Sequence, residues 1–208
     1  MIKIEYVNVV GWESAIRGMR NPMNSWDKSD SCKNFDTGVI AIGNNDLDLM
    51  KRLAKAGTDH RKFMRMIVVY ADVTAPLYWW KEFDTYKVGT VRNSCSTMHT
   101  IHVDEFALDD FSHEKMKDYA VRELERTIVT LNGLRFDFYS SGRDKSYWDS
   151  IIQLLPSSYN QRATLMLNYE VLANMYHSRK NHKLDEWVEF CKWIETLPYS
   201  ELITNENV

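Results

Sequence analysis

The chain has 208 residues, enough for one domain with a full hydrophobic core, and we expect a single domain over 1–208. Apolar residues make up 44% and charged residues 26%, which is ordinary for a globular protein, and no apolar run approaches the roughly 20 residues that cross a bilayer. The formal net charge of −3 lacks the basic excess of proteins that bind DNA or RNA. Neither a nucleic acid nor a membrane is therefore an expected partner.

The first half of the sequence predicts strands that alternate with short helices. The N-terminal residues alternate between apolar and polar side chains, as in a half-buried strand. β-Branched and aromatic residues are concentrated between Lys62 and Val73, which favours a longer strand. The expected elements are a strand over 1–10, a helix over 12–20, a polar loop over 21–34, a short strand over 39–42, a helix from Asn45 or Asp46 to Gly57, a strand over 62–73, and a helix beginning at Pro76 that holds Trp79, Trp80 and Phe83.

The second half predicts mainly helices. Residues 88–110 combine Gly, Ser, Asn and Thr with few apolar runs, and an irregular loop of this length is usually functional or disordered. Leu165, Tyr169, Leu172 and Tyr176 recur at helical spacing. The expected helices run from Ser112 to Asn132, with Gly133 as the stop, and over 145–155, 157–178 and 184–196. The predicted fold class is α+β, with a mixed sheet, long helices and a helix-rich second half.

The three cysteines, Cys32, Cys95 and Cys191, form neither a metal-binding spacing nor an even set for disulfides. A reducing, cytoplasmic location is the natural inference. The N-terminus has no long apolar stretch of the kind found in signal peptides. His99 and His102 would lie on opposite faces of a strand, so we expect no metal site there. Cys95 lies in a polar run and is a candidate reactive thiol.

Two segments of the sequence keep a set of landmarks at fixed separations. The first segment holds Asp59-His60, Ala75-Pro76, Lys81-Glu82 and the run Tyr86-Lys87-Val88-Gly89-Thr90. The second segment holds Leu155-Pro156, Asn168 and Arg179, followed by His182 and Glu186. In order and spacing these landmarks resemble those of the flavin-dependent thymidylate synthases, the ThyX family. The resemblance covers residues 57–98 and 150–198 and implies a ThyX-like fold.

The family signature R-H-R-x-x-S falls on Thr85, Tyr86, Lys87 and Thr90, of which only Lys87 and Thr90 are conservative matches. A lysine in place of an arginine loses the planar fork that binds phosphate through two hydrogen bonds. Glu170 stands where the family often has an arginine. The resemblance implies that His60, Lys62, Tyr86, Lys87, Asn168 and His182 bind the flavin, that Glu82, Thr90, Arg92, Asn93, Ser94, Ser96 and Arg179 bind the nucleotide, and that Arg179 is also catalytic.

Asn168 and Arg179 also have a reading that is independent of the family. Eleven residues at about 100° each return to nearly the same side of a helix, roughly 16 Å further along its axis. If the predicted helix over 157–178 extends to Arg179, both side chains lie on one face. The alternative is that Arg179 is a solvated cation at a helix end, where Arg and Lys are favoured.

The resemblance implies a cytoplasmic methyltransferase of pyrimidine metabolism, which methylates dUMP with reduced FAD as the hydride donor and methylenetetrahydrofolate as the carbon donor. It also implies a homotetramer with sites shared between subunits. A second hypothesis is a diverged ThyX-like protein that binds or sequesters a nucleotide and has no thymidylate synthase activity. A third is a structural or partner-binding domain. The departures from the signature at Thr85 and Tyr86 favour the second hypothesis.

Overall fold

The structure, a computed structural model, describes residues 2–34, 36, 38 and 40–205. These residues form two compact units. The first unit comprises 2–4, 73–85 and 93–164, and the second unit comprises 5–72, 86–92 and 165–205. The expectation of one domain over 1–208 stays a prediction.

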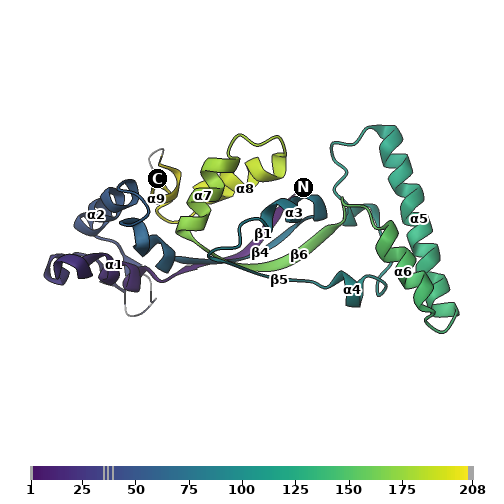
Figure 1. Ribbon diagram of the computed structural model, residues 1–208, viewed down its shortest axis with the longest axis horizontal. Coiled ribbons are helices and arrows are strands. Elements are labelled where there is room, and N and C mark those ends of the chain that lie inside the picture. Colours follow the sequence, from purple (N-terminus) through teal and green to yellow (C-terminus); the bar gives the residue numbers. More distant parts are fainter. Residues whose placement is uncertain (1, 35, 37, 39, 206–208) are drawn as a thin grey trace. The chain divides into compact units, whose positions relative to one another are not determined.

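Four strands of the described chain form one sheet, in the order β1-β4-β6-β5 (Figure 1). They are β1 (Lys3–Val10), β4 (Val68–Pro76), β5 (Thr90–Ser94) and β6 (Asn160–Asn168). β6 alternates as a strand should, because Ala163, Leu165 and Leu167 are buried whereas Arg162 and Thr164 are exposed. Since β6 is hydrogen-bonded to both β4 and β5, the sheet joins the two segments that carry the family resemblance.

The second unit is mainly helical. Its elements are α1 (Trp12–Arg20), η1 (Asn21–Met23), η2 (Trp26–Lys28), β2 (Cys32–Lys33), β3 (Ile40–Ala41), α2 (Asn44–Lys55), η3 (Arg61–Met66), α7 (Tyr169–Arg179), α8 (Asp185–Glu195) and α9 (Glu201–Thr204), where η denotes a 3-10 helix. β2 and β3 form an antiparallel pair, with Cys32 opposite Ala41. Helix η3 contacts α1, α2 and α7, and α7 contacts α8 and α9. Met50, Met64 and Trp187 are fully buried, so α2, η3 and α8 all contribute to the core of this unit.

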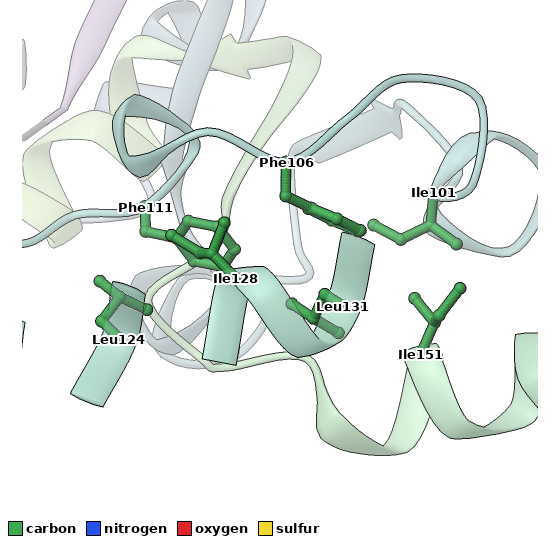
Figure 2. Packing of buried hydrophobic residues seen from close by; sticks show 7 residues of the cluster. All are labelled: Ile101, Phe106, Phe111, Leu124, Ile128, Leu131 and Ile151. Atoms are coloured by element: carbon green, nitrogen blue, oxygen red, sulfur yellow. The ribbon is translucent and has the colours of Figure 1, made fainter. Parts of the chain in front are cut away.

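The first unit holds the longest helix of the described chain. Its elements are α3 (Leu77–Phe83), α4 (Thr97–Thr100), η4 (Leu108–Asp110), α5 (Asp118–Ser140) and α6 (Lys145–Leu154). α5 packs against α6. Figure 2 shows their shared apolar cluster, in which Leu124, Ile128 and Leu131 of α5 and Ile151 of α6 lie with Ile101, Phe106 and Phe111.

The structure confirms the α+β fold class and several predicted elements. The strand over 1–10, the helix over 12–20, the helix over 145–155 and the helix over 184–196 appear within two residues of their predicted ends. Met1 lies outside the described residues. The short strand over 39–42 appears as β3, and Val39 also lies outside the described residues.

The predicted helix over 157–178 is wrong in its first half. Residues 160–168 form β6, and the helix begins at Tyr169 with Asn168 as its N-cap. The helical spacing of Leu165 and Tyr169 was coincidental, because the alternating burial of Ala163, Leu165 and Leu167 belongs to a strand. Asn168 is therefore not inside the helix that carries Arg179, and the expectation that both share one helical face does not hold.

Other elements also differ from the prediction. Residues 62–66 form the 3-10 helix η3 rather than a strand, and its adjacent residues Phe63 and Met64 are both buried. The loop predicted over 88–110 contains β5, α4 and η4. The helix predicted from Asn45 or Asp46 is capped at Gly43, and Asp46 is buried inside it. Gly133 lies within α5 instead of ending it.

Helix α5 also begins later than predicted, at Asp118 rather than Ser112. The Ser112 hydroxyl donates to Asn160 Oδ1 at 2.8 Å and its backbone N–H donates to Ser158 O at 2.8 Å, so Ser112 is held in extended structure. Gly133 costs about 1 kcal/mol of helix propensity relative to Ala. The burial of Ile128 and Leu131 in the same helix offsets that cost.

Candidate functional site

Gly89 and Asn168 bring the two segments of the family resemblance together inside the second unit. Gly89 has φ +76°, in the left-handed region that favours glycine. A Cβ atom on Gly89 would lie 2.4 Å from Asn168 Nδ2, so there is no room for a side chain. Asn168 Oδ1 accepts a hydrogen bond from Val171 N–H at 2.9 Å and thereby caps α7. The cap fixes the Asn168 side chain against the backbone of the turn before β5.

Arg179, at the C-terminal end of α7, lies among aromatic side chains of the same unit. Its Nε donates to Tyr86 Oη at 2.9 Å. Its guanidinium carbon is 5.6 Å from the centre of the Tyr86 ring and 4.8 Å from that of the buried Trp187. Cation–π contacts of this kind contribute about 0.5–2 kcal/mol. Arg179 is therefore a half-buried cation whose orientation is fixed, and not a solvated helix end.

His182 is the third ring beside Arg179. Its Nε2 lies 2.9 Å from Arg179 Nη1, and its Nδ1 lies 3.2 Å from the backbone N–H of Leu184. Both neighbours are donors, whereas a neutral imidazole has only one acceptor nitrogen. The tautomer therefore decides which of the two contacts is a hydrogen bond. The ring centres of His182 and Trp187 are 6.4 Å apart, so His182 belongs with Tyr86 and Trp187 to the group of rings around Arg179.

Glu170 lies in the first turn of α7 and is 7% exposed. It accepts hydrogen bonds from Arg61 Nε at 3.2 Å and from Arg65, whose Nε and Nη2 both reach the carboxylate. Burial by itself would raise the pKa of Glu170, but the hydrogen bonds and charges of Arg65 and Arg61 together lower it below its usual value. A negative charge is also favoured at the N-terminal end of a helix. Glu170 thus couples η3 to the start of α7.

The remaining predicted site residues lie in both units. In the second unit, His60 immediately precedes η3, Lys62 lies within it, and both are exposed, as is Lys87. Thr90 and Arg92 are on β5, and the buried Oγ1 of Thr90 has no hydrogen-bond partner among the residues that the structure describes. In the first unit, Glu82 is on α3, Asn93 and Ser94 end β5, and Ser96 caps α4 by accepting from His99 N–H at 3.3 Å.

Three features of the site were not predicted. Trp187 was not among the predicted site residues, although its ring centre lies 4.8 Å from the guanidinium carbon of Arg179. The contact of Gly89 with Asn168 and the pairing of Glu170 with Arg61 and Arg65 join residues far apart in the sequence. No local pattern predicts the last of these, because η3 is a 3-10 helix, in which residues three apart, and not four, lie on one side.

Within residues 2–34, 36, 38 and 40–205, no group of three or more His, Cys, Asp and Glu side chains is placed to hold a metal ion. In the same part of the chain, no helix has the length and apolar character needed to span a bilayer. The cytoplasmic location stays a prediction.

Comparison with known proteins identifies the fold. No protein-family model and no curated protein matches the sequence. The crystal structure of thymidylate synthase X from Helicobacter pylori, with FAD and dUMP, superposes with a TM-score of 0.74 at 16% identity, over 100% of this chain and 98% of that chain. A second structure of flavin-dependent thymidylate synthase ThyX from Helicobacter pylori, complexed with FAD and dUMP, gives 0.71 at 17% identity, over 98% and 99% of the two chains.

A third similar structure is the UMP/dUMP methylase PolB from Streptomyces cacaoi bound with 5-Br dUMP. It superposes with a TM-score of 0.65 at 15% identity, over 100% of this chain and 94% of that chain. At such identities the comparisons define the fold. The chain has the fold of the flavin-dependent thymidylate synthases, as the spacing of its landmarks predicts.

Proposed function

We propose that the chain binds a pyrimidine nucleotide together with FAD and that in its active form it is a ThyX-like methyltransferase acting on dUMP. The observation that carries the proposal is a pair of contacts within the second unit, of Tyr86 with Arg179 and of Gly89 with Asn168. These residues come from the two segments that resemble the ThyX family, which lie far apart in the sequence. The proposal is further supported by fold neighbours that bind FAD and dUMP.

The donors near Gly89 fit the anionic part of FAD. Lys87, two residues before Gly89, is exposed, and its ammonium group can bind a phosphate oxygen. Thr90 Oγ1, one of the proposed nucleotide contacts, is buried and lacks a hydrogen-bond partner in the described chain, which is costly unless a ligand group is bound. His60, Lys62, Asn168 and His182 complete the proposed flavin-binding set. Reduced FAD would supply a hydride, and methylenetetrahydrofolate would supply the carbon.

Arg179 has the central role in the proposed reaction. A guanidinium can donate to a carbonyl oxygen of the pyrimidine and stabilise negative charge that develops there. The contacts with Tyr86, Trp187 and His182 hold the guanidinium in place before a ligand binds, so that little reorganisation is needed. The proposed nucleotide contacts are Glu82, Thr90, Arg92, Asn93, Ser94, Ser96 and Arg179.

A second candidate function rests on the three positions where the family has R-H-R. Thr85 Oγ1 donates to Glu82 O at 2.7 Å, and Tyr86 Oη accepts from Arg179. Two of the three side chains are therefore engaged within the protein, and Lys87 is the one cation left of the signature. This arrangement favours a protein that binds or sequesters a nucleotide without thymidylate synthase activity.

One preparation separates the candidates. Purified protein that is yellow, with the visible absorbance of an oxidised flavin, and that binds dUMP more tightly than deoxyuridine supports the FAD-dependent enzyme. Colourless protein whose heat extract contains a nucleotide supports the sequestering protein. Colourless protein that binds neither dUMP nor FAD contradicts both and leaves a structural domain.

We also propose that the chain is a homotetramer with dihedral symmetry, the arrangement that the family resemblance implies. Val129 and Phe136 on α5 are 73% and 69% exposed, whereas Ile128 and Leu131 of the same helix are buried in the cluster of Figure 2. Exposed large apolar side chains often mark protein contacts. Light scattering at micromolar concentration is expected to give four times the mass of the chain. A monomer would contradict the tetramer and any site built from several subunits.

A further inference from the structure

A pocket of about 370 Å³ lies in the second unit, at α1, η2 and the β2–β3 pair. This volume is within the range of pockets that hold small molecules. Its lining includes Arg17, Trp26, Cys32 and Lys33. None of the residues proposed to bind FAD or dUMP lines it, so it is distinct in sequence from the site around Arg179.

The inner wall of this pocket is fixed by the fully buried carboxylate of Asp46. Asp46 accepts hydrogen bonds from Arg20 Nε at 2.6 Å, Ser29 Oγ at 2.7 Å and Ser31 Oγ at 2.6 Å, and from the backbone N–H of Ser31 at 3.1 Å. The Asp46 carboxylate therefore balances the charge of Arg20, and the hydroxyls of Ser29 and Ser31 already have a hydrogen-bond partner. The inner wall of the pocket is therefore formed before a ligand binds. The outer residues of the pocket would make the contacts that recognise the ligand.

Arg17 is the outer residue with an uncommitted charge. It is exposed in the last turn of α1 and makes no hydrogen bond or ion pair with any residue that the structure describes. Lys33 Nζ lies 3.4 Å from Glu13 Oε2, and the two side chains are 47% and 67% exposed. An ion pair this exposed is worth at most about 1 kcal/mol, so an anion can displace it. Within the described chain, the mouth of the pocket thus offers Arg17 as a free cation and Lys33 as a weakly held one.

Trp26 supplies a flat apolar surface beside these cations. Trp26 is 50% exposed. Its indole Nε1 donates to Asn21 Oδ1 at 2.9 Å, so the protein itself holds the ring in place and the nitrogen needs no water as a partner. Ile16 and Ile40 add apolar lining. A half-exposed indole stacks on planar rings, whereas Arg and Lys bind carboxylate or phosphate oxygens.

We propose that this pocket binds a small planar aromatic molecule carrying an anionic group, with its ring against Trp26 and its anion on Arg17 and Lys33. The site does not depend on the proposed reaction with dUMP. An aromatic phosphate ester and an aromatic carboxylate share this chemistry, and neither the ring nor the anion alone fills both parts of the pocket.

Protection of Cys32 from alkylation reports whether a ligand occupies the pocket. Cys32 lines the pocket and is exposed, Cys95 is exposed in the first unit, and Cys191 is buried. The rate at which iodoacetamide alkylates each cysteine is followed by peptide mass spectrometry. The probe is 1-naphthyl phosphate; 1-naphthol carries the ring alone and inorganic phosphate the anion alone. At ten times its dissociation constant, 1-naphthyl phosphate is expected to slow alkylation of Cys32 about tenfold and to leave Cys95 unchanged.

Variants then assign the effect to the pocket. Arg17→Gln removes an exposed cation without a partner in the described chain, so folding is expected to be unaffected while the probe binds about tenfold more weakly. Arg52→Gln, which removes an exposed arginine of α2 outside this pocket, is the matched control and should protect like the parent protein. The proposal is overturned if 1-naphthyl phosphate does not protect Cys32, if 1-naphthol or phosphate protects it equally well, or if Arg17→Gln leaves protection unchanged.

Discussion

The guanidinium carbon of Arg179 lies 4.8 Å from the centre of the Trp187 ring, and its Nε donates to Tyr86 Oη at 2.9 Å. The end of α7, the start of α8 and the turn before β5 therefore meet at one cation. A charge fixed by an aromatic face and a hydrogen bond is oriented before any ligand arrives. Arg179 is therefore not a solvated cation, and its role in nucleotide binding stays a prediction.

Arg179→Lys is expected to fold and to weaken dUMP binding or turnover by about 2–4 kcal/mol, since lysine keeps the charge but loses the planar donors. Nucleotide titration and thermal melting of the same variant measure the two effects. Arg126→Lys, on the exposed side of α5, is the control. An unchanged titration with a lowered melting temperature would show that Arg179 only stabilises the fold.

Lys87→Ala is expected to weaken FAD binding by a factor that grows as the salt concentration is lowered, because less screening makes the lost charge count more. Riboflavin, which has no phosphate, should bind the variant and the parent protein equally. Lys55→Ala removes another exposed lysine, at the end of α2, and should have no effect. Equal affinity of the parent protein for FAD and riboflavin would mean that Lys87 binds no phosphate.

Gly89→Ala is expected to destabilise the protein by more than the roughly 1–2 kcal/mol that a left-handed backbone costs, because the new Cβ would lie 2.4 Å from Asn168 Nδ2. Gly142→Ala is the matched control, since Gly142 has φ +74° and a Cβ there would meet nothing within 4 Å. Urea unfolding measures both. Adding Asn168→Ser should recover the excess cost, because serine still caps α7 and is smaller. Equal losses at Gly89 and Gly142 would contradict the close contact.

Asp46 is expected to make stability depend on acid pH. Burial would raise its pKa, but hydrogen bonds from Ser31, Ser29 and Arg20 lower it below the usual 3.8. A carboxylate with a lowered folded-state pKa stabilises the fold above its unfolded value and loses that contribution as the pH falls through the folded pKa. The free energy of unfolding should therefore decrease as the pH falls below 3.8.

The variant Asp46→Asn should flatten this acid dependence and lower stability by about 3–5 kcal/mol at neutral pH, because it leaves the buried Arg20 without its counter-charge. Denaturant unfolding at a series of pH values gives both quantities. Asp48→Asn, at a less buried position of the same helix, should change neither. If the acid dependence is the same in Asp46→Asn and the parent protein, another carboxylate causes it.

Local patterns predicted the helices over 12–20 and 184–196, in which the buried residues recur at helical spacing. The strand over 1–10 was predicted from its alternating sequence, although the burial of β1 does not alternate. Residues 160–179 could not be divided correctly, because a strand and a helix meet at Asn168 without a break in apolar character. Residues 160–168 form a strand because β6 pairs with β4 and β5, and this pairing is a long-range interaction.

Family spacing implied that Tyr86, Asn168 and Arg179 belong to one site, and that assignment stays a prediction. The structure shows that Arg179 contacts Tyr86 and that Asn168 lies against Gly89. The helical argument for Asn168 and Arg179 was incorrect, since it assumed one continuous helix. The role of Gly89 depends on its distance to Asn168, and no local pattern encodes that distance.

Glu170 has a consequence for how this chain could change over time. The family often has an arginine at this position, but here Glu170 lies between Arg61 and Arg65 and is 7% exposed. An arginine introduced alone would place three positive side chains together with no counter-charge from Glu170. A reversal of the charge at 170 is therefore expected to be tolerated best together with a change at Arg61 or Arg65. We expect the three positions to change together rather than singly, because reversing the charge at 170 alone brings like charges into contact.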